Sequence, residues 1–305
     1  MRISTSTIFD GGSARLTDLQ AQLARTSRQL GSGRKVLTPS DDPVAAARAL
    51  EVQQSASINE QYAKNRLNLK NSLGVMDGSL SSMVDTLQGM QEQVIAAGNG
   101  SYCDSDRAAI AAVLQGQLDQ LLSLANSTDG AGHQLFAGQQ IGTPAFAADP
   151  LSGAIAYQGD AAQQSVQVDG TRKMTINQAG ETLFPVLNGN NIFNQLRAAI
   201  ADLQTPNLPA ATHTAQLNAL GTALAQTLTS VSTVQSGVGT QLQQLDALDS
   251  LGSDRQLQYQ QTLSDLQALD YNQALSDLSR QQLALQVAQK TFAQISQLSL
   301  FDYIN

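Results

Sequence analysis

The sequence predicts a mainly α-helical protein: a long antiparallel helical rod, or coiled-coil bundle, with a small β-rich domain inserted at the end distal to the termini. Apolar side chains recur at alternating steps of three and four residues in both halves of the chain, which places them on one face of a helix. Between these halves, residues 138–190 contain short alternating runs bounded by Gly, Pro and Asp, a pattern typical of strands and turns. Aromatic residues make up only 4% of the chain, which suits long helices with narrow seams.

Residues 1–42 are predicted to form an N-terminal assembly segment and a hinge. The segment carries an apolar stripe with helical spacing, and a narrow stripe of this kind needs a partner helix to cover it. The stripe, which we expect to belong to an assembly seam, consists of Leu16, Leu19, Leu23 and Leu30.

Residues 43–137 are predicted to form the first half of the rod. The same spacing runs without interruption from Leu73 to Val94, so we expect one helix from about Pro43 to Ala97. Such a helix is roughly 80 Å long at about 1.5 Å per residue. It cannot cover its own stripe and therefore requires partner helices. A shorter helix is predicted at about 106–126.

The remaining chain supplies the inserted domain and the partner helices. Within 138–190, the runs AIAYQG, QSVQVDG and KMTINQAG predict strands joined by tight turns. Residues 191–252 are predicted to form the second half of the rod, which ends at the helix-breaking LGSD of 251–254. Residues 253–305 then form a C-terminal assembly helix, whose seam consists of Leu278, Leu285, Phe292 and Ile295.

A hinge is predicted in GSGRKVLTPSDDPVAAARAL, residues 31–50, where glycines, prolines and charges precede a run of helix-formers. Glycine suits the left-handed end of the first helix. The second helix can be capped by Thr38 or by Ser40, and acidic residues oppose the positive end of its dipole in either case. Physical chemistry alone favours an ordinary joint between two helices here. The predicted hinge and helix cap comprise Gly31, Gly33, Pro39, Ser40, Asp41, Asp42 and Pro43.

Catalytic and metal-binding motifs do not emerge from the sequence. The segment GSGRK follows a predicted helix and lacks the Ser or Thr that ends a P-loop. His133 and His213 have no Cys or His companions at ligand spacing, and Cys103 has no base nearby in sequence. Asp104 and Asp106 lack the glycine and terminal glutamate of an EF-hand. We therefore expect no enzyme activity, no cofactor and no metal site.

Charge and hydropathy restrict the partners. The net charge of −8 disfavours nucleic acid and anionic membranes, because both attract basic patches. No apolar run approaches the roughly 18 residues of a membrane-spanning helix, so we expect no membrane insertion. The N-terminus lacks the apolar core of a cleaved secretory signal, so export would need another route.

Two long motifs carry a family resemblance. An apolar-stripe helix followed by SGRK and PSDDPVAAARAL resembles the N-terminal signature of the bacterial flagellin superfamily. The segment LDYNQALSDLSRQQLALQVAQKTFAQISQLSLFDYI is similar to the C-terminal helix of the same superfamily, so the resemblance covers about residues 1–100 and 250–305. The opening MRISTSTIF, the ending SLFDYI, the short length, LFAG and AYQGD resemble the member that joins hook to filament. A filament subunit is the alternative.

This resemblance implies a structural, non-enzymatic protein of the extracellular bacterial flagellum, secreted through the flagellar export route as an unfolded chain. The implied partners are further copies of itself in a ring or tube, a neighbouring hook-associated protein and flagellin, and a cytoplasmic export chaperone. A coiled-coil adaptor shares the apolar spacing but does not need the charge-poor terminus or the inserted strands. A secreted needle-tip protein shares export and the rod shape but should display a more conspicuous binding face.

The end of the chain also favours assembly on physical grounds. The closing 25 residues hold only two charges, Lys290 and Asp302. Neutral polar faces suit helices crowded by neighbours, because each buried charge would need a partner. We therefore expect the terminal segments to become ordered when sister molecules surround them, and the β-rich domain to project outward from the tube.

Overall fold

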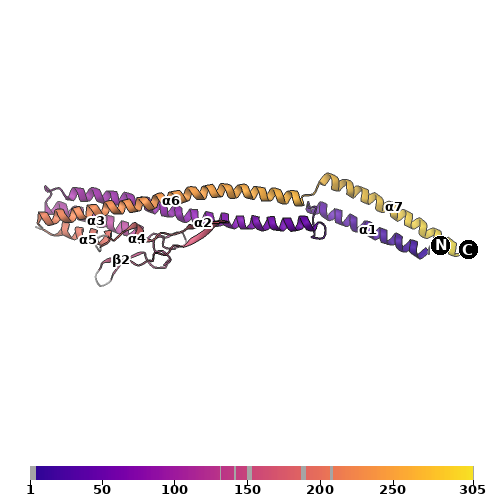
Figure 1. Ribbon diagram of the computed structural model, residues 1–305, viewed down its shortest axis with the longest axis horizontal. Helices are drawn as coiled ribbons and strands as arrows, with labels where there is room; N and C mark the ends of the chain where they lie inside the picture. The colour runs from indigo at the N-terminus through magenta and orange to yellow at the C-terminus, as the bar shows by residue number, and fades with distance from the viewer. Residues whose placement is uncertain are drawn as a thin grey trace. The chain divides into compact units, whose positions relative to one another are not determined.

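The computed structural model describes residues 5–304, apart from 131, 141, 150–152, 187–189 and 207–208; the side chains of 5, 6, 8, 210 and 295–304 are not described. The chain divides into two compact units. Unit 1 combines Met1–Ile58 with Asp254–Asn305, and unit 2 is Asn59–Ser253. Helices dominate both units (Figure 1), so the prediction of a mainly α-helical fold is confirmed.

Unit 1 is built from helices that come from both ends of the chain. Helix α1 (Thr5–Ser32) packs antiparallel to α7 (Tyr271–Ile304), so the first turns of α1 lie beside the last turns of α7 (Figure 1). The first part of α2 (Pro43–Ala97) and the last part of α6 (Ala210–Gln267) complete the unit. Helix α2 begins and ends at the predicted residues.

Unit 2 contains a continuous apolar core. It is formed by the rest of α2 and α6 together with α3 (Asp104–Ala125) and α5 (Ile192–Gln204). The apolar stripe that the sequence predicts on α2 lies at the centre of this core. Its fully buried members include Met76, Leu80, Met83, Leu87 and Met90, each 0% exposed.

The β-rich region of unit 2 consists of two antiparallel hairpins. Strand β1 (Phe146–Ala148) pairs with β2 (Ile155–Tyr157), and β3 (Ser165–Asp169) pairs with β4 (Arg172–Thr175). All four strands fall within 138–190, but β1 was not among the predicted runs. A one-turn helix, α4 (Gly180–Leu183), follows β4.

An aromatic cluster attaches the first hairpin to the helices. The Phe146 ring lies 5.2 Å from the ring of Tyr157, 5.3 Å from that of Phe184 and 5.0 Å from that of Phe193 on α5. These separations are in the range of favourable tilted and edge-to-face pairs. Much of the small aromatic content is therefore concentrated where the strands meet the helices.

The helix break predicted at LGSD, 251–254, is wrong. Helix α6 continues through this segment to Gln267, and the break before α7 lies at Ala268–Asp270. Asp270 marks the new start, since its Oδ1 accepts hydrogen bonds from the backbone N–H of Asn272 at 2.9 Å and of Gln273 at 3.1 Å. Among the described residues, no helix combines the length and apolarity that crossing a membrane requires.

Candidate functional site

The predicted assembly seam forms one contact between α1 and α7 in unit 1. On α1, Leu16, Leu19, Leu23 and Leu30 are each only partly buried, and the same holds on α7 for Leu278, Leu285 and Phe292. The side chain of Ile295, the eighth predicted member, lies outside the described residues. The two helices contact each other, and each of these described side chains remains partly exposed.

Aromatic contact fixes the distal part of this helix pair. The rings of Phe9 and Phe292 lie 4.9 Å apart with a tilt of 45°. Gly12 permits this arrangement, because a Cβ placed there would lie 2.7 Å from the Phe292 ring. Phe9 and Gly12 are not among the predicted seam residues, although both precede the leucine stripe at helical spacing.

Gly33 ends α1 and begins a backbone bridge within unit 1. Its φ of +68° is the left-handed conformation that favours glycine, whereas Gly31 lies inside the helix. The Lys35 N–H donates to the Gln267 carbonyl at 2.7 Å, and the Leu269 N–H donates to the Gly33 carbonyl at 3.1 Å. The segment after α1 is therefore tied to the segment between α6 and α7.

A tight turn follows this bridge. Pro39 occupies the second position of the turn 38–41, which is closed by the Asp41 N–H donating to the Thr38 carbonyl at 2.9 Å. The Ser40 hydroxyl lies 2.8 Å from that of Thr38. The backbone bond closes the turn, and Asp41 occupies its fourth position.

Asp41 is held by three partners. Its Oδ2 accepts hydrogen bonds from the backbone N–H groups of Thr38 and Leu37, both at 2.9 Å, and its Oδ1 pairs with Arg25 of α1 at 2.8 Å. The amides of Thr38 and Leu37, and then the Arg25 guanidinium, lower the pKa of the Asp41 carboxyl below its usual value. Asp41 thus connects the turn to α1.

The cap of α2 lies later than either predicted alternative. Neither Thr38 nor Ser40 caps the helix; Asp42 does, since its Oδ1 accepts a hydrogen bond from the Ala45 N–H at 2.9 Å. Pro43 then occupies the first helical position, where its missing N–H costs nothing. The predicted cap failed because 38–41 forms a closed turn instead of the first turn of α2.

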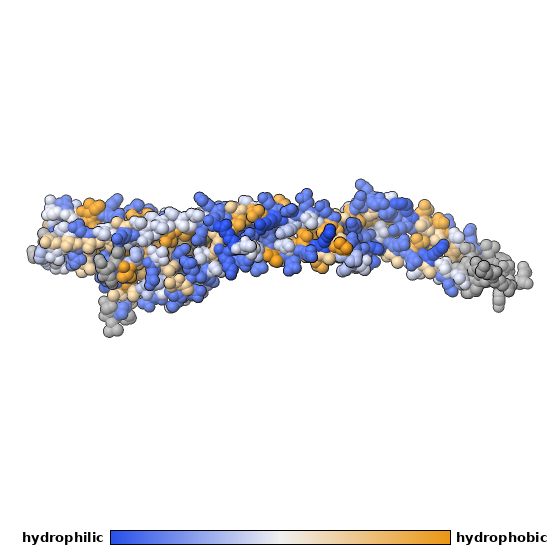
Figure 2. Space-filling model, viewed as in Figure 1, coloured by the Kyte–Doolittle hydropathy of each residue, from blue (hydrophilic) through white to orange (hydrophobic). Residues whose placement is uncertain are grey.

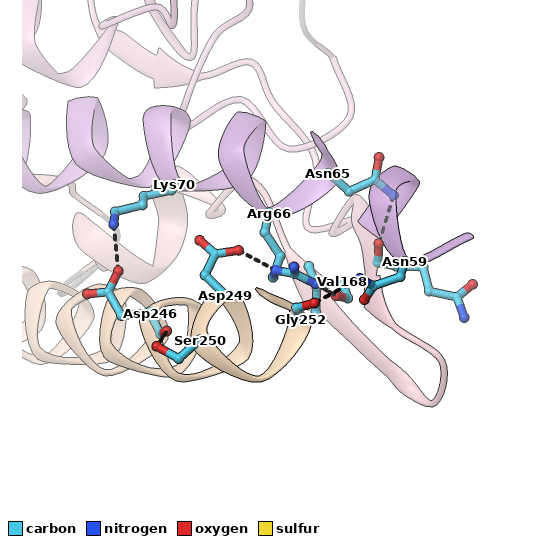
Figure 3. Close-up of polar contacts among 10 residues, drawn as sticks. Asn59, Asn65, Arg66, Lys70, Val168, Asp246, Asp249, Ser250 and Gly252 are labelled. Atoms are coloured by element: carbon cyan, nitrogen blue, oxygen red, sulfur yellow. Dashed lines mark hydrogen bonds and ion pairs between the residues drawn. The ribbon is translucent and has the colours of Figure 1, made fainter. Parts of the chain in front are cut away.

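A buried polar cluster joins three elements of unit 2 (Figure 3). The Arg66 side chain, on α2, is 2% exposed, and its Nε donates to Asp249 of α6 at 2.5 Å. Its Nη1 donates to the backbone carbonyl of Val168 in β3 at 2.9 Å. One guanidinium therefore holds α2, α6 and the second hairpin together.

Further polar contacts flank Arg66 on both sides along α2 (Figure 3). Asn59 donates to the Gly252 carbonyl at 2.8 Å, Asn65 donates to the Gln167 carbonyl at 2.8 Å, and Lys70 pairs with Asp246 at 2.5 Å. Lys70 and Asp246 are largely exposed, so this last pair contributes little compared with Arg66.

Gly252 explains why α6 continues through the predicted break. A Cβ at this position would lie 2.4 Å from Nη2 of Arg66, so the bare glycine makes room for the guanidinium. Glycine costs about 1 kcal/mol in a helix relative to alanine, but the contact with Arg66 and the bond from Asn59 hold the backbone here. The sequence carried a signal for this cluster, because Arg66 occupies a stripe position three residues before Leu69.

Three of the other polar candidates, Cys103, Asp106 and His133, have local structural partners. Cys103 precedes α3 as its N-cap, and its N–H donates to Oδ2 of Asp106 at 3.0 Å. The Cys103 thiol, and then its backbone N–H, lower the pKa of Asp106. His133 lies 3.2 Å from Asp129 through Nδ1. Among the described side chains, no group of three His, Cys, Asp or Glu is placed to hold a metal ion.

Comparisons with known proteins cover the whole chain. A family model described as the bacterial flagellin N-terminal helical region matches residues 3–141. The chain is 36% identical to Flagellar hook-associated protein 3 of Escherichia coli K12 and 37% identical to the protein of that name from Salmonella typhimurium LT2, with 99% of each chain covered. It is 29% identical to the Flagellar filament 41 kDa core protein of Borreliella burgdorferi over 35% of this chain and 32% of that protein.

Solved structures share the fold. A flagellar hook-associated protein of Vibrio parahaemolyticus matches with a TM-score of 0.69 and 28% identity, over 75% of this chain and 100% of that chain. The flagellar hook-associated protein 3 of Legionella pneumophila matches with a TM-score of 0.65 and 21% identity, over 71% and 98%. The latter similarity concerns the fold alone.

Proposed function

Because the chain belongs to the Flagellar hook-associated protein 3 family of bacterial flagellins, we propose that it is a structural subunit of the flagellum that polymerises as the junction between hook and filament. In this role the chain adapts the hook to a filament of flagellin. The function requires surfaces that bind neighbouring subunits, and it requires no catalytic group.

The observation that carries this proposal is a second apolar face on α7. Leu275, Leu283 and Val287 are 53%, 63% and 55% exposed, and their spacing of eight and four residues places them on one side of the helix. We call these three residues the outer stripe. At about 100° per residue, the seam residues Leu278 and Leu285 are turned by roughly 140° or more from Leu283 and Val287, whereas Leu275 lies roughly 60–80° from them, at the edge between the two faces.

A helix with apolar residues on two opposite faces needs partners on both. α1 covers only one face of α7, and apolar residues interrupt the polar surface of this helix pair in several places (Figure 2). The low charge of the last 25 residues lowers the cost of covering the second face. Further copies of the chain, at the same position in a ring or tube, supply the missing contacts.

The division of the chain follows from this role. Segments 1–42 and 253–305 carry the contacts between subunits, and the turn at 31–43 links the first of them to the rod. The rod halves 43–137 and 191–252 support the β-rich insert 138–190, which provides spacing and lateral contact outside the tube. The family resemblance adds a neighbouring hook-associated protein, flagellin and a cytoplasmic export chaperone as partners at successive stages.

The chain's relatives favour a junction over a filament subunit. The similarity to hook-associated protein 3 extends over 99% of the chain, whereas the similarity to a filament protein is confined to 35% of it. The full-length match also includes the β-rich insert, where a junction and a filament subunit have different neighbours.

Deletion of the gene tests the proposed role directly. Electron microscopy of the deletion strain should show hooks without filaments, and flagellin should accumulate in the culture medium. The wild-type gene on a plasmid should restore the filaments. Filaments of normal length on the deletion strain's hooks would refute the junction role. As a control, the deletion strain must export all other hook components at normal levels.

A pair of matched variants tests the assembly surface. Leu283→Gln on the outer stripe should be secreted at the wild-type level but fail to restore filaments, because it replaces an apolar contact by an amide. Leu67→Gln changes a similarly exposed leucine of unit 2, 57% exposed against 63%, and should restore them. Equal filament counts for the two strains would show that the outer stripe is not an assembly surface.

A further inference from the structure

Unit 2 contains a cavity of about 360 Å³ beside the polar cluster of Figure 3. This volume lies at the lower end of the range for small-molecule sites, about 300–1,000 Å³. The cavity lies between α2, the loop that follows α3, and the β3–β4 hairpin with its flanking residues. The residues that line it are Asn65, Asn68, Leu69, Ser72, Asp129, His133, Gln134, Leu135, Gln164, Val166, Ile176 and Asn177.

One polar atom of this lining has no hydrogen-bond partner among the described residues. The side-chain Oε1 of Gln134 is buried, and no donor among the described residues reaches it. A buried acceptor without a donor costs about 1–3 kcal/mol, so such atoms are rare and call for an explanation. A ligand that donates a hydrogen bond inside the cavity removes this cost.

The neighbouring polar groups are held in place before any ligand binds. Asp129 receives the His133 backbone N–H at 2.9 Å and faces the His133 ring at 3.2 Å. Asn177 accepts the Gln164 N–H at 2.9 Å and donates to the Gly138 carbonyl at 2.5 Å. Because these side chains already have fixed partners, they lose less conformational entropy when a ligand binds.

The chemistry of the lining specifies the ligand class. No Lys or Arg is among the described residues that line the cavity, so an anion finds no counter-charge there. The carboxylate of Asp129 is engaged by His133, which disfavours a cation as the main ligand. Amide and hydroxyl groups, from Asn68, Ser72 and Gln134, suit a neutral molecule with several hydroxyls.

Apolar residues form the rest of the wall. Leu69, Leu135, Val166 and Ile176 offer a surface for carbon-bound hydrogens, and the apolar part of the lining exceeds the polar part. A ring that has hydroxyls at its edge and C–H groups on its face matches both kinds of surface. We propose that this cavity binds a neutral polyhydroxylated ring of the monosaccharide class, with a ligand hydroxyl donating to Gln134 Oε1.

Binding can be measured on the purified full-length chain. Glucose, galactose and N-acetylglucosamine are added one at a time, and saturation-transfer NMR records magnetisation passing from protein methyl groups to the sugar. At least one sugar should receive saturation. Gln134→Leu removes the orphaned acceptor at nearly constant volume and should weaken binding about tenfold or more.

Two further variants separate binding from folding. Gln139→Leu changes an exposed glutamine outside the lining and should leave affinity unchanged. Asn68→Leu changes the opposite wall, on an exposed helical position, and should weaken binding while circular dichroism stays at the wild-type level. The junction role does not enter this measurement, so its outcome is independent of the flagellar proposal.

Three results would overturn the proposal. The first is that none of the three sugars receives saturation at a concentration of about 50 mM, which lies far above the useful range of such sites. The second is equal affinity in Gln134→Leu and the wild type. The third is concentration-dependent self-association that Gln134→Leu abolishes, since this would assign the cavity to a segment of a second copy.

Discussion

The helical seams of unit 1 and unit 2 have the same spacing but different degrees of burial. On α2, residues such as Met76 and Leu80 are 0% exposed, because α3, α5 and α6 supply neighbours on several sides. In unit 1, the buried apolar side chains among the described residues are three alanines, Ala45, Ala49 and Ala274, and they are 9%, 2% and 6% exposed. The leucines of the α1–α7 seam remain partly exposed.

This difference shows what the spacing of apolar residues can predict about the burial of a helix face. Alternating steps of three and four residues determine which face of a helix is apolar, and this information is local. The number of helices that cover the face depends on the chain's topology and on other molecules. A half-covered seam in unit 1, in contrast to the fully covered seam in unit 2, is what the proposed assembly with further copies predicts.

The largest expected effect comes from truncating one leucine in each seam. Leu80→Ala should lower the free energy of unfolding of unit 2 by about 2.7–5 kcal/mol, since the fully buried side chain leaves a cavity. Leu19→Ala, in the partly covered seam, should lower that of unit 1 by about 1 kcal/mol or less. Hydrogen exchange with mass spectrometry reads the two units separately. Equal losses would mean that the α1–α7 seam is as complete as the core.

The polar cluster allows a second comparison, inside unit 2. Arg66→Ala should lower the free energy of unfolding by about 2–3 kcal/mol, because it leaves the Val168 carbonyl without its donor and Asp249 without its partner. This loss of stability is moderate, because the Asp249 side chain is 41% exposed and can be rehydrated. Lys70→Ala breaks an exposed pair on the same helix and should cost less than about 1 kcal/mol.

Urea unfolding followed by circular dichroism measures both variants. A cost for Lys70→Ala that matches the cost for Arg66→Ala would show that burial does not decide the strength of these contacts. A second readout is the exchange of the β3 amides. Arg66→Ala should accelerate it, because Arg66 bonds to this strand, while Lys70→Ala should leave it unchanged.

Long-range polar contacts mark the limit of what the sequence predicts. The leucine stripes, the bounds of α2 and the strands β2, β3 and β4 follow from local patterns, and the structure contains all of them. The helical LGSD segment does not, because its glycine is explained by Arg66, which lies 186 residues earlier in the chain. The contact between Gly252 and Arg66 therefore cannot be predicted from residues that are neighbours in the sequence.

The hinge shows the same limit at shorter range. The predicted hinge segment spans the junction of α1 and α2, but Gly31 lies inside α1, and the cap is Asp42 instead of Thr38 or Ser40. Both alternatives satisfy local capping rules equally well. The choice depends on Asp41, whose bonds to Leu37, Thr38 and Arg25 close a turn before α2 can begin. Arg25 belongs to α1, so the start of one helix depends on another.

Two glycines, one inside α1 and one just after it, sharpen the comparison at the hinge. Gly33→Ala should destabilise unit 1 by about 1–2 kcal/mol, because φ is +68° and a Cβ would lie 2.7 Å from the Tyr271 hydroxyl. Gly31→Ala lies in the helix with open space around it and should stabilise unit 1 by about 0.5–1 kcal/mol. Thermal unfolding of both variants checks the signs. Destabilisation by Gly31→Ala would place the end of α1 before residue 31.

The smallest expected effect is the pH dependence of the turn that Asp41 holds. Its carboxyl pKa is lowered from 3.8 by the Thr38 amide, the Leu37 amide and then Arg25. A carboxyl whose pKa is lower in the folded state stabilises that state above the unfolded value, and the contribution disappears as pH falls through the folded value. The turn should therefore be unaffected between about pH 7 and 5 and should loosen below pH 3.8.

NMR shifts of the Leu37 and Thr38 amides report this titration directly, since both amides donate to the carboxylate. Arg25→Gln removes the charged partner but leaves both amide bonds, so its midpoint should rise only part of the way towards 3.8. A midpoint that returns fully to that value would make the ion pair to α1 the dominant cause. The turn would then depend on α1 for its stability, and the half-covered seam of unit 1 would govern the start of α2 as well.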